Sequence, residues 1–337
     1  MERWIEELFN ERVLEEAALM FGANSANAKK LGDFENYVYE VNKEEKPYIL
    51  RLTHSSHRSM ADVEAEMQWI NFLHKHGVNV SLAYFSKNER LVEEAKVGET
   101  SFFVCLFDKA PGELVKMKSD LFGPELFTLW GKVTGKMHKV TQDYEASGPK
   151  RSRWDENDLL DFHTYMPEEE IREAAKNLLD VIQKLPETKE VFNLIHSDIH
   201  PGNFFYHKGE IHVFDFDDSS YHYLVSDIAI PLYYSVWFVH RGENLQTRSA
   251  FGEEMLYHFL TGYLEEYEMS DEWLNKIPLF LKLRDFELYS IFHKKFDLEN
   301  MNDREKEVLQ QLKERLLQDE PIVQIDFENI IRKVRNK

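Results

Sequence analysis

The sequence predicts an α+β fold in which a group of β-strands comes first and a group of helices follows. Short stretches rich in β-branched and aromatic residues gather in the first third of the chain. From residue 124 onward, apolar residues recur mainly at helical spacing. A Pro111-Gly112 pair interrupts both patterns between the two regions. We therefore expect two domains, comprising residues 1–107 and residues 108–337.

Charge and cysteine content limit the possible partners and the compartment. The 337 residues include 41 basic and 61 acidic side chains, a net charge of −20. An acidic chain is a poor binder of nucleic acid or anionic membranes, so we expect neither as a partner. The single cysteine, Cys105, lies in an apolar strand pattern and excludes an internal disulfide framework, which suits the cytoplasm. The start of the chain shows no signal-peptide pattern, and the sequence leaves the oligomeric state open.

The first region predicts a helix followed by an antiparallel sheet of five strands. An amphipathic helix pattern covers residues 61–77 and ends at a glycine, and an earlier apolar stripe predicts a helix over residues 4–21. Strand patterns cover residues 37–41, 46–53, 78–80, 91–93 and 100–107.

The second region predicts a series of helices. In the helix pattern over residues 124–140, Gly131 and Gly135 share a face on which another backbone can approach closely. Further helix patterns cover residues 159–166, 167–185, 251–267, 273–294, 308–317 and 327–334.

One stretch of the second region, residues 193–218, carries the polar residues of a reaction centre. Apolar runs at residues 204–206 and 211–214 flank turn residues and predict a β-hairpin. His196, Asp198 and Asn203 precede this hairpin in a loop, and Asp215 follows its last strand.

The spacing of these side chains has a chemical logic. Phosphoryl transfer to a hydroxyl needs a carboxylate that orients the hydroxyl and accepts its proton, and a metal ion that neutralises the phosphates. Asp198 precedes Asn203 by five residues, as in the kinase pattern H-R-D-x-x-x-x-N, and Asp215 stands where the Asp of D-F-G is expected. The oxygen ligands of Asn203 and Asp215 suit Mg²⁺.

The segments His196-Ser-Asp-Ile-His-Pro-Gly-Asn203 and Val213-Phe-Asp-Phe-Asp217 resemble the aminoglycoside phosphotransferase and choline kinase superfamily. Within it, the chain looks most like the type II homoserine kinase branch. The resemblance implies a bilobal, protein-kinase-like fold with ATP and Mg²⁺ as cofactors. It also implies that Asp198 is the catalytic base and that Asn203 and Asp215 are metal ligands.

The same resemblance assigns residues of the first region to the nucleotide. Arg51 stands where these kinases place the cation that binds the triphosphate, and a Glu on the next helix is expected to hold it. Glu66 and Glu64 are both candidates, and the position of Glu66 fits better. The remaining nucleotide residues lie in a phosphate-covering turn with Gly32, Phe34 and Asn36, and in a hinge strand with Leu106 and Phe107.

The residues that bind the acceptor are harder to identify from the sequence. Asp217 and Asp218 follow the predicted metal ligand, where they can bind an amine, bind a second metal ion or only face solvent. Arg284 and Glu287 lie on a helix of the part that lines the acceptor pocket in the family, and we expect them to contact the substrate.

Taken together, these observations predict an ATP-dependent phosphotransferase that acts on a hydroxyl of a small metabolite, for example an amino alcohol such as homoserine. An aminoglycoside or sugar phosphotransferase is an alternative. A catalytically inactive binding or structural protein with a kinase fold is another. The presence of Asp198, Asn203 and Asp215 together favours an enzyme.

Overall fold

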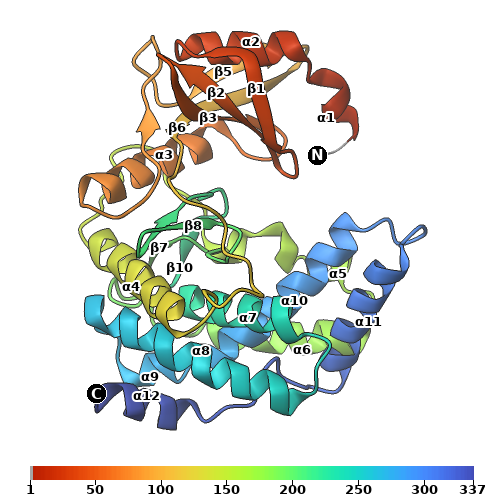
Figure 1. The fold of residues 1–337 in the computed structure, drawn as a ribbon. Helices are drawn as coiled ribbons and strands as arrows, with labels where there is room; N and C mark the ends of the chain where they lie inside the picture. Colours follow the sequence, from red (N-terminus) through yellow and green to blue (C-terminus); the bar gives the residue numbers. More distant parts are fainter. Residues whose placement is uncertain (1–2) are drawn as a thin grey trace. The chain divides into compact units, whose positions relative to one another are not determined.

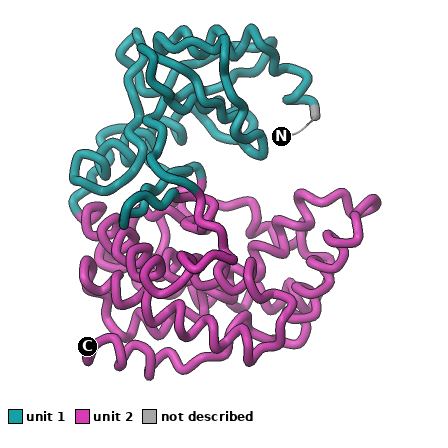
Figure 2. Tube along the Cα trace, viewed as in Figure 1, with its two compact units in different colours: residues 1–113, 143–151, 205–217 teal, residues 114–142, 152–204, 218–337 magenta. Residues whose placement is uncertain are grey.

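The computed structural model describes residues 3–337, which pack into two compact units (Figure 2). Of the described residues, unit 1 comprises residues 3–113, 143–151 and 205–217. Unit 2 comprises residues 114–142, 152–204 and 218–337. The chain therefore returns twice to unit 1, and the predicted hairpin with Asp215 is part of the second return.

Unit 1 is built on an antiparallel sheet of six strands, one more than the sequence predicted. The strands pair in the order β1-β2-β3-β6-β4, and β5 pairs with β6. Their bounds are Asn24–Gly32 for β1, Asn36–Lys43 for β2, Lys46–His54 for β3, Ala83–Tyr84 for β4, Glu93–Val97 for β5 and Thr100–Asp108 for β6.

Two strand predictions were wrong for identifiable reasons. The extra strand, β1, is an edge strand with a mostly exposed burial pattern, so its sequence lacks the apolar alternation of a half-buried strand. The apolar run at residues 78–80 forms no strand; Val80 makes only an isolated bridge to Val213. A two-residue strand, β4, takes its place in the sheet.

The helices of unit 1 are α1 (Arg3–Leu8), α2 (Glu11–Met20) and α3 (Met60–Lys75). Asn10 divides the predicted N-terminal helix, because its side chain accepts hydrogen bonds from the backbone N–H groups of Arg12 and Val13 and so caps α2. Helix α2 packs against β1 and β5 (Figure 1) and shares a buried apolar core with the sheet.

A β-hairpin of β8 (Phe204–His207) and β9 (Glu210–Val213) confirms the prediction for the central stretch. Lys208 and Gly209 in its turn both have positive φ, 49° and 87°, as a two-residue hairpin turn requires. The apolar run before the loop with Asp198 forms β7 (Phe192–Ile195), which pairs with β10 (Ser220–Tyr223).

Unit 2 is mostly helical, as predicted (Figure 1). Its helices are α4 (Pro124–Thr141), α5 (Phe162–Tyr165), α6 (Glu169–Ile182), α7 (Ser226–His240), α8 (Leu245–Glu266), α9 (Asp271–Leu274), α10 (Ile277–Lys295), α11 (Asp303–Leu317) and α12 (Phe327–Arg335), with 3-10 turns at Trp154–Glu156 and Asp158–Leu160. Within residues 3–337, none of the helices has the length and apolar character needed to cross a membrane.

Helices α4 and α8 lie side by side with their backbones unusually close (Figure 1). A Cβ atom on Gly131 would lie 1.8 Å from the carbonyl oxygen of Phe259, and one on Gly262 would lie 1.9 Å from that of Thr128. Gly135 is similarly close to Tyr263. The glycine face predicted from the sequence is therefore the contact that brings α8 against α4.

We predict that Gly131→Ala lowers the free energy of unfolding by about 1–3 kcal/mol or more, because the added methyl group forces two helix backbones apart. Urea-induced unfolding measures the change. Gly242→Ala is the matched control, since its Cβ would meet no atom within 4 Å, and it should shift stability by less than about 0.5 kcal/mol. Equal stability of the two variants would show that the close approach is not required.

Candidate active site

The loop after β7 carries Asp198 and is held by a buried carboxylate. The N–H groups of His196 and Ser197 donate to Asp227 Oδ2 and Oδ1 at 2.9 and 2.8 Å. Ser197 has a φ of 66°, a conformation that costs a residue with a side chain and that the two hydrogen bonds help to hold. Asp227 lies in the first turn of α7, but its side chain binds the loop and does not cap that helix.

The carboxylate of Asp198 is engaged through both oxygens within unit 2. The Asn203 amide donates to the Asp198 carbonyl at 2.9 Å and to Oδ2 at 3.1 Å. His200 Nε2 lies 3.3 Å from Oδ2, and Arg284 Nη2 donates to Oδ1 at 2.9 Å. Burial alone would raise the pKa of Asp198, but His200 and then Arg284 outweigh it, so the pKa is lowered and the ionised form is favoured.

Arg51 and Glu66 form the predicted pair inside unit 1. The Arg51 guanidinium on β3 makes two parallel hydrogen bonds to the Glu66 carboxylate on α3, at 2.7 and 2.6 Å. Both side chains are buried. Burial disfavours the charged guanidinium, but Glu66 more than compensates and raises the pKa of Arg51. Glu64, the other candidate, is only partly buried.

Cys105 pairs with Arg51 across β3 and β6 and is fully buried. Burial raises the pKa of its thiol to about 12, so the thiolate is scarce at neutral pH. Cys105 is a core residue.

Asp217 is buried in unit 1 and faces cations. Its Oδ2 lies 2.7 Å from His57 Nε2 and 3.4 Å from Arg58 Nη2, and its backbone carbonyl accepts from Arg151. Burial would raise the pKa of Asp217, but the hydrogen bond from His57, followed by the charge of Arg58, lowers it. Asp218, in contrast, is exposed and belongs to unit 2.

The predicted phosphate-covering turn joins β1 to β2. Gly32 ends β1, Phe34 is exposed at the tip, and Asn36 is buried at the start of β2 with its Oδ1 lacking a hydrogen-bond partner. Glu35 in the same turn lies 3.2 Å from His57 Nδ1. His57 thus links this turn to Asp217.

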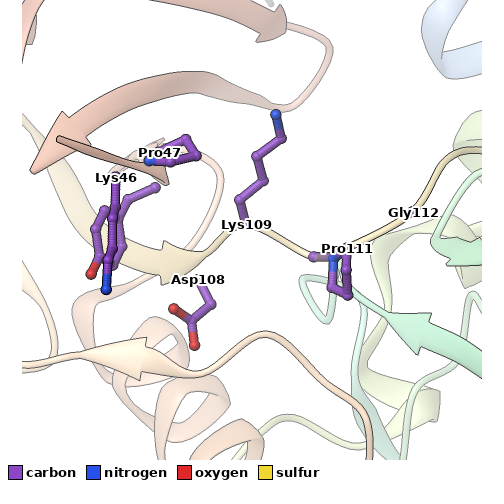
Figure 3. Close-up of a pocket in the computed structure, with 8 residues that line it drawn as sticks. Lys46, Pro47, Asp108, Lys109, Pro111 and Gly112 are labelled. Atoms are coloured by element: carbon purple, nitrogen blue, oxygen red, sulfur yellow. The ribbon is translucent and has the colours of Figure 1, made fainter. Parts of the chain in front are cut away.

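The two hinge candidates, Leu106 and Phe107, are buried in β6. The chain leaves this strand beside a pocket of about 420 Å³ (Figure 3). The first residues of β3, Lys46, Pro47 and Tyr48, form one side of it, and residues 108–112 form the other. The end of the candidate hinge therefore borders an open concave surface.

The residues predicted to bind a divalent ion have suitable donor atoms. Because the Asn203 amide group donates to Asp198, its Oδ1 points elsewhere, and no hydrogen bond among residues 3–337 uses it. Asp215 has a φ of 63°, an uncommon backbone conformation of the kind that clusters at functional sites. Amide and carboxylate oxygens are the ligands that Mg²⁺ prefers.

Several contacts around the predicted site residues were not foreseen from the sequence. His57 and Asp217 are 160 residues apart, and Arg151 and Asp217 are 66 apart. His200 and Tyr234, which border Asp198 and Arg284, were also not predicted. His200 had the best available signal, since it follows Asp198 by two residues in the motif.

Comparison with known proteins identifies the family of the chain. The model of the phosphotransferase enzyme family (APH) matches residues 28–273, well over half of the chain. The chain belongs to this family. Family membership confirms the predicted superfamily and identifies the chain as a phosphotransferase that acts on small molecules.

Two relatives are similar over nearly the whole chain. Amicoumacin kinase of Bacillus subtilis (strain 168) is 38% identical over 333 residues, which cover 97% of this chain and 98% of that protein. The structure of the amicoumacin kinase hAmiN, in complex with AMP-PNP, Ca²⁺ and Ami, superposes with a TM-score of 0.91 at 34% identity and covers 98% of this chain and all of that one. The nucleotide analogue and divalent ion in hAmiN agree with the predicted cofactors, ATP and a divalent metal ion.

A more distant structure shows the fold alone. The microcompartment-associated aminopropanol kinase is 17% identical, with a TM-score of 0.71 over 92% of this chain and 98% of that one. These likenesses confirm the predicted α+β, protein-kinase-like fold of the family.

We predict that Glu66→Ala lowers the free energy of unfolding by about 3–5 kcal/mol, because it leaves the buried Arg51 guanidinium without its counter-charge. Urea-induced unfolding measures the loss. Glu64→Ala, on the same helix, is the matched control and should change stability by less than about 0.5 kcal/mol. If both variants were equally stable, the Arg51–Glu66 pair would not support unit 1.

Proposed function

We propose that this protein is an ATP- and Mg²⁺-dependent kinase that phosphorylates a hydroxyl of an amine-bearing small molecule, with amicoumacin as the first candidate. We choose amicoumacin because the chain is similar over nearly its whole length to two amicoumacin kinases.

In this proposal Asp198 is the catalytic base. The acceptor hydroxyl donates its proton to the Asp198 carboxylate while its oxygen bonds to the transferred phosphorus and the bond to the leaving phosphate breaks. The lowered pKa keeps Asp198 ionised before the reaction. Asn203 holds the Asp198 carboxylate and backbone in place through its amide hydrogens.

The cofactor residues follow from the motif and from the local geometry. Asn203 Oδ1 and Asp215 would hold Mg²⁺, which neutralises phosphate charge when bound. Arg51, oriented by Glu66, would bind the triphosphate, and the turn with Gly32, Phe34 and Asn36 would cover it. Leu106 and Phe107 would offer backbone groups to the adenine. These assignments rest on the match to the kinase pattern.

The surroundings of Asp198 suit an acceptor that carries an amine. In unit 2 a single guanidinium, Arg284, faces two carboxylates, Asp198 and Glu287. The partly exposed ring of Phe238 stacks on Tyr234 nearby, with ring centroids 5.1 Å apart, and offers an apolar surface. An acceptor with a cationic group and an apolar body fits this combination.

Asp217 has a different role in this proposal. Because His57 and Arg58 already engage its carboxylate, we assign Asp217 to anchoring the segment between β3 and α3. Asp218 is exposed and stays a candidate for the acceptor amine. Homoserine, aminoglycosides and sugars remain acceptors to be compared with amicoumacin.

The proposal predicts acceptor-dependent release of ADP from Mg-ATP. The panel should contain amicoumacin, aminopropanol, homoserine, an aminoglycoside and a hexose, and we expect amicoumacin to have the highest kcat/KM. Asp198→Asn should lower kcat by about 100-fold or more, because the base is lost, while nucleotide affinity stays unchanged.

Asp180→Asn, an exposed position on α6, is the matched control and should keep normal turnover. Full turnover of Asp198→Asn would disprove the assignment of the base. Efficient turnover of a hexose with no turnover of any amine-bearing acceptor would disprove the proposed substrate class.

A further inference from the structure

We propose that Arg284 is a positioning residue of the reaction: it fixes the carboxylate of Asp198 in the orientation from which that group accepts the hydroxyl proton. This inference rests on the proposed role of Asp198 as the base. All residues involved belong to unit 2.

The two oxygens of Asp198 are held from different parts of the fold. Asn203 and His200, both in the catalytic loop, contact Oδ2. Arg284, on α10 and 86 residues away in sequence, contacts Oδ1 at 2.9 Å. Contacts at Oδ2 alone hold the carboxylate at one point, about which it can still pivot through combined changes of χ1 and χ2. The contact from Arg284 at Oδ1 holds it at a second point and so restrains this pivot.

Arg284 is itself held rigidly. Its Nη1 donates to Glu287 Oε2 at 3.0 Å, and the hydroxyl of Tyr234 on α7 lies 2.6 Å from Nη2. The guanidinium carbon lies 5.0 Å from the centre of the Tyr234 ring, within the range of a cation–π contact. Only 11% of the Arg284 side chain is exposed. Because these contacts fix the planar guanidinium, its Nη2 holds Asp198 Oδ1 in one well-defined position.

Positioning has a direct consequence for proton transfer. Each carboxylate oxygen has two lone pairs, so Oδ1 can accept from Arg284 and still receive the hydroxyl proton. Arg284 thereby orients the Asp198 carboxylate without preventing it from accepting the proton. Without Arg284, the carboxylate samples orientations that miss the hydroxyl, and a misplacement of about 1 Å can cost about 100-fold in rate.

The test compares Arg284→Met with Arg284→Lys in steady-state kinetics, with nucleotide binding measured by titration calorimetry. We expect Arg284→Met to lower kcat by about 100-fold, while nucleotide affinity stays within about threefold of the original. Arg284→Lys should recover part of kcat, because one ammonium can contact Oδ1 but cannot also hold Glu287 in the same fork. If Arg284 had only a structural role, its replacement would lower the stability of the protein and leave kcat per folded molecule unchanged.

Lys282→Met is the matched control, since Lys282 lies two residues away on α10, pairs with the exposed Asp319 and should leave kcat unchanged. If Arg284→Met does not fold, Arg284→Met/Glu287→Leu replaces the ion pair with an apolar pair. It is compared with Glu287→Leu alone, because Glu287 is itself expected to contact the acceptor, and the double variant must show the larger loss of kcat. Normal kcat in Arg284→Met, with Asp198→Asn inactive, would overturn the positioning role alone. Normal kcat in Asp198→Asn would overturn the proposed base instead.

Discussion

The hydrogen bonds to Asp227 from the loop that carries Asp198 are the constraint on which the placement of this loop depends. A fully buried carboxylate is stable only when its charge is compensated, and Asp227 receives two backbone N–H groups and lies 3.3 Å from His138 Nε2. His138 Nδ1 in turn lies 2.8 Å from the hydroxyl of Tyr263. The loop that carries Asp198 is thus tied to α7, α4 and α8 through one buried polar network.

The glycine contacts between α4 and α8 explain how this network can form. His138 lies on α4 and Tyr263 lies on α8, so their hydrogen bond requires the two helices to be close. Gly131 and Gly262 permit that approach because neither carries a Cβ atom. Packing of two helices far from the loop in sequence therefore sets the backbone of the loop, and the loop sets the position of Asp198.

The sequence was informative where function is encoded locally. Asp198 and Asn203 are five residues apart and recognisable as a pair, and Arg51 and Glu66 lie on adjacent elements with a known order. Contacts such as His57 with Asp217 or Arg284 with Asp198 depend on tertiary packing, and no spacing rule reveals them. Strand β1 was missed because an exposed edge strand needs no apolar face.

The most direct test of this account is the turnover number of Asp227→Asn at saturating acceptor and nucleotide. The asparagine can accept one loop N–H through its carbonyl oxygen, but its amide group faces the other N–H donor and repels it. The account predicts a loss of about 100-fold or more in kcat, because Asp198 moves, with unchanged nucleotide affinity. Wild-type turnover in this variant would show that Asp227 does not position the catalytic loop.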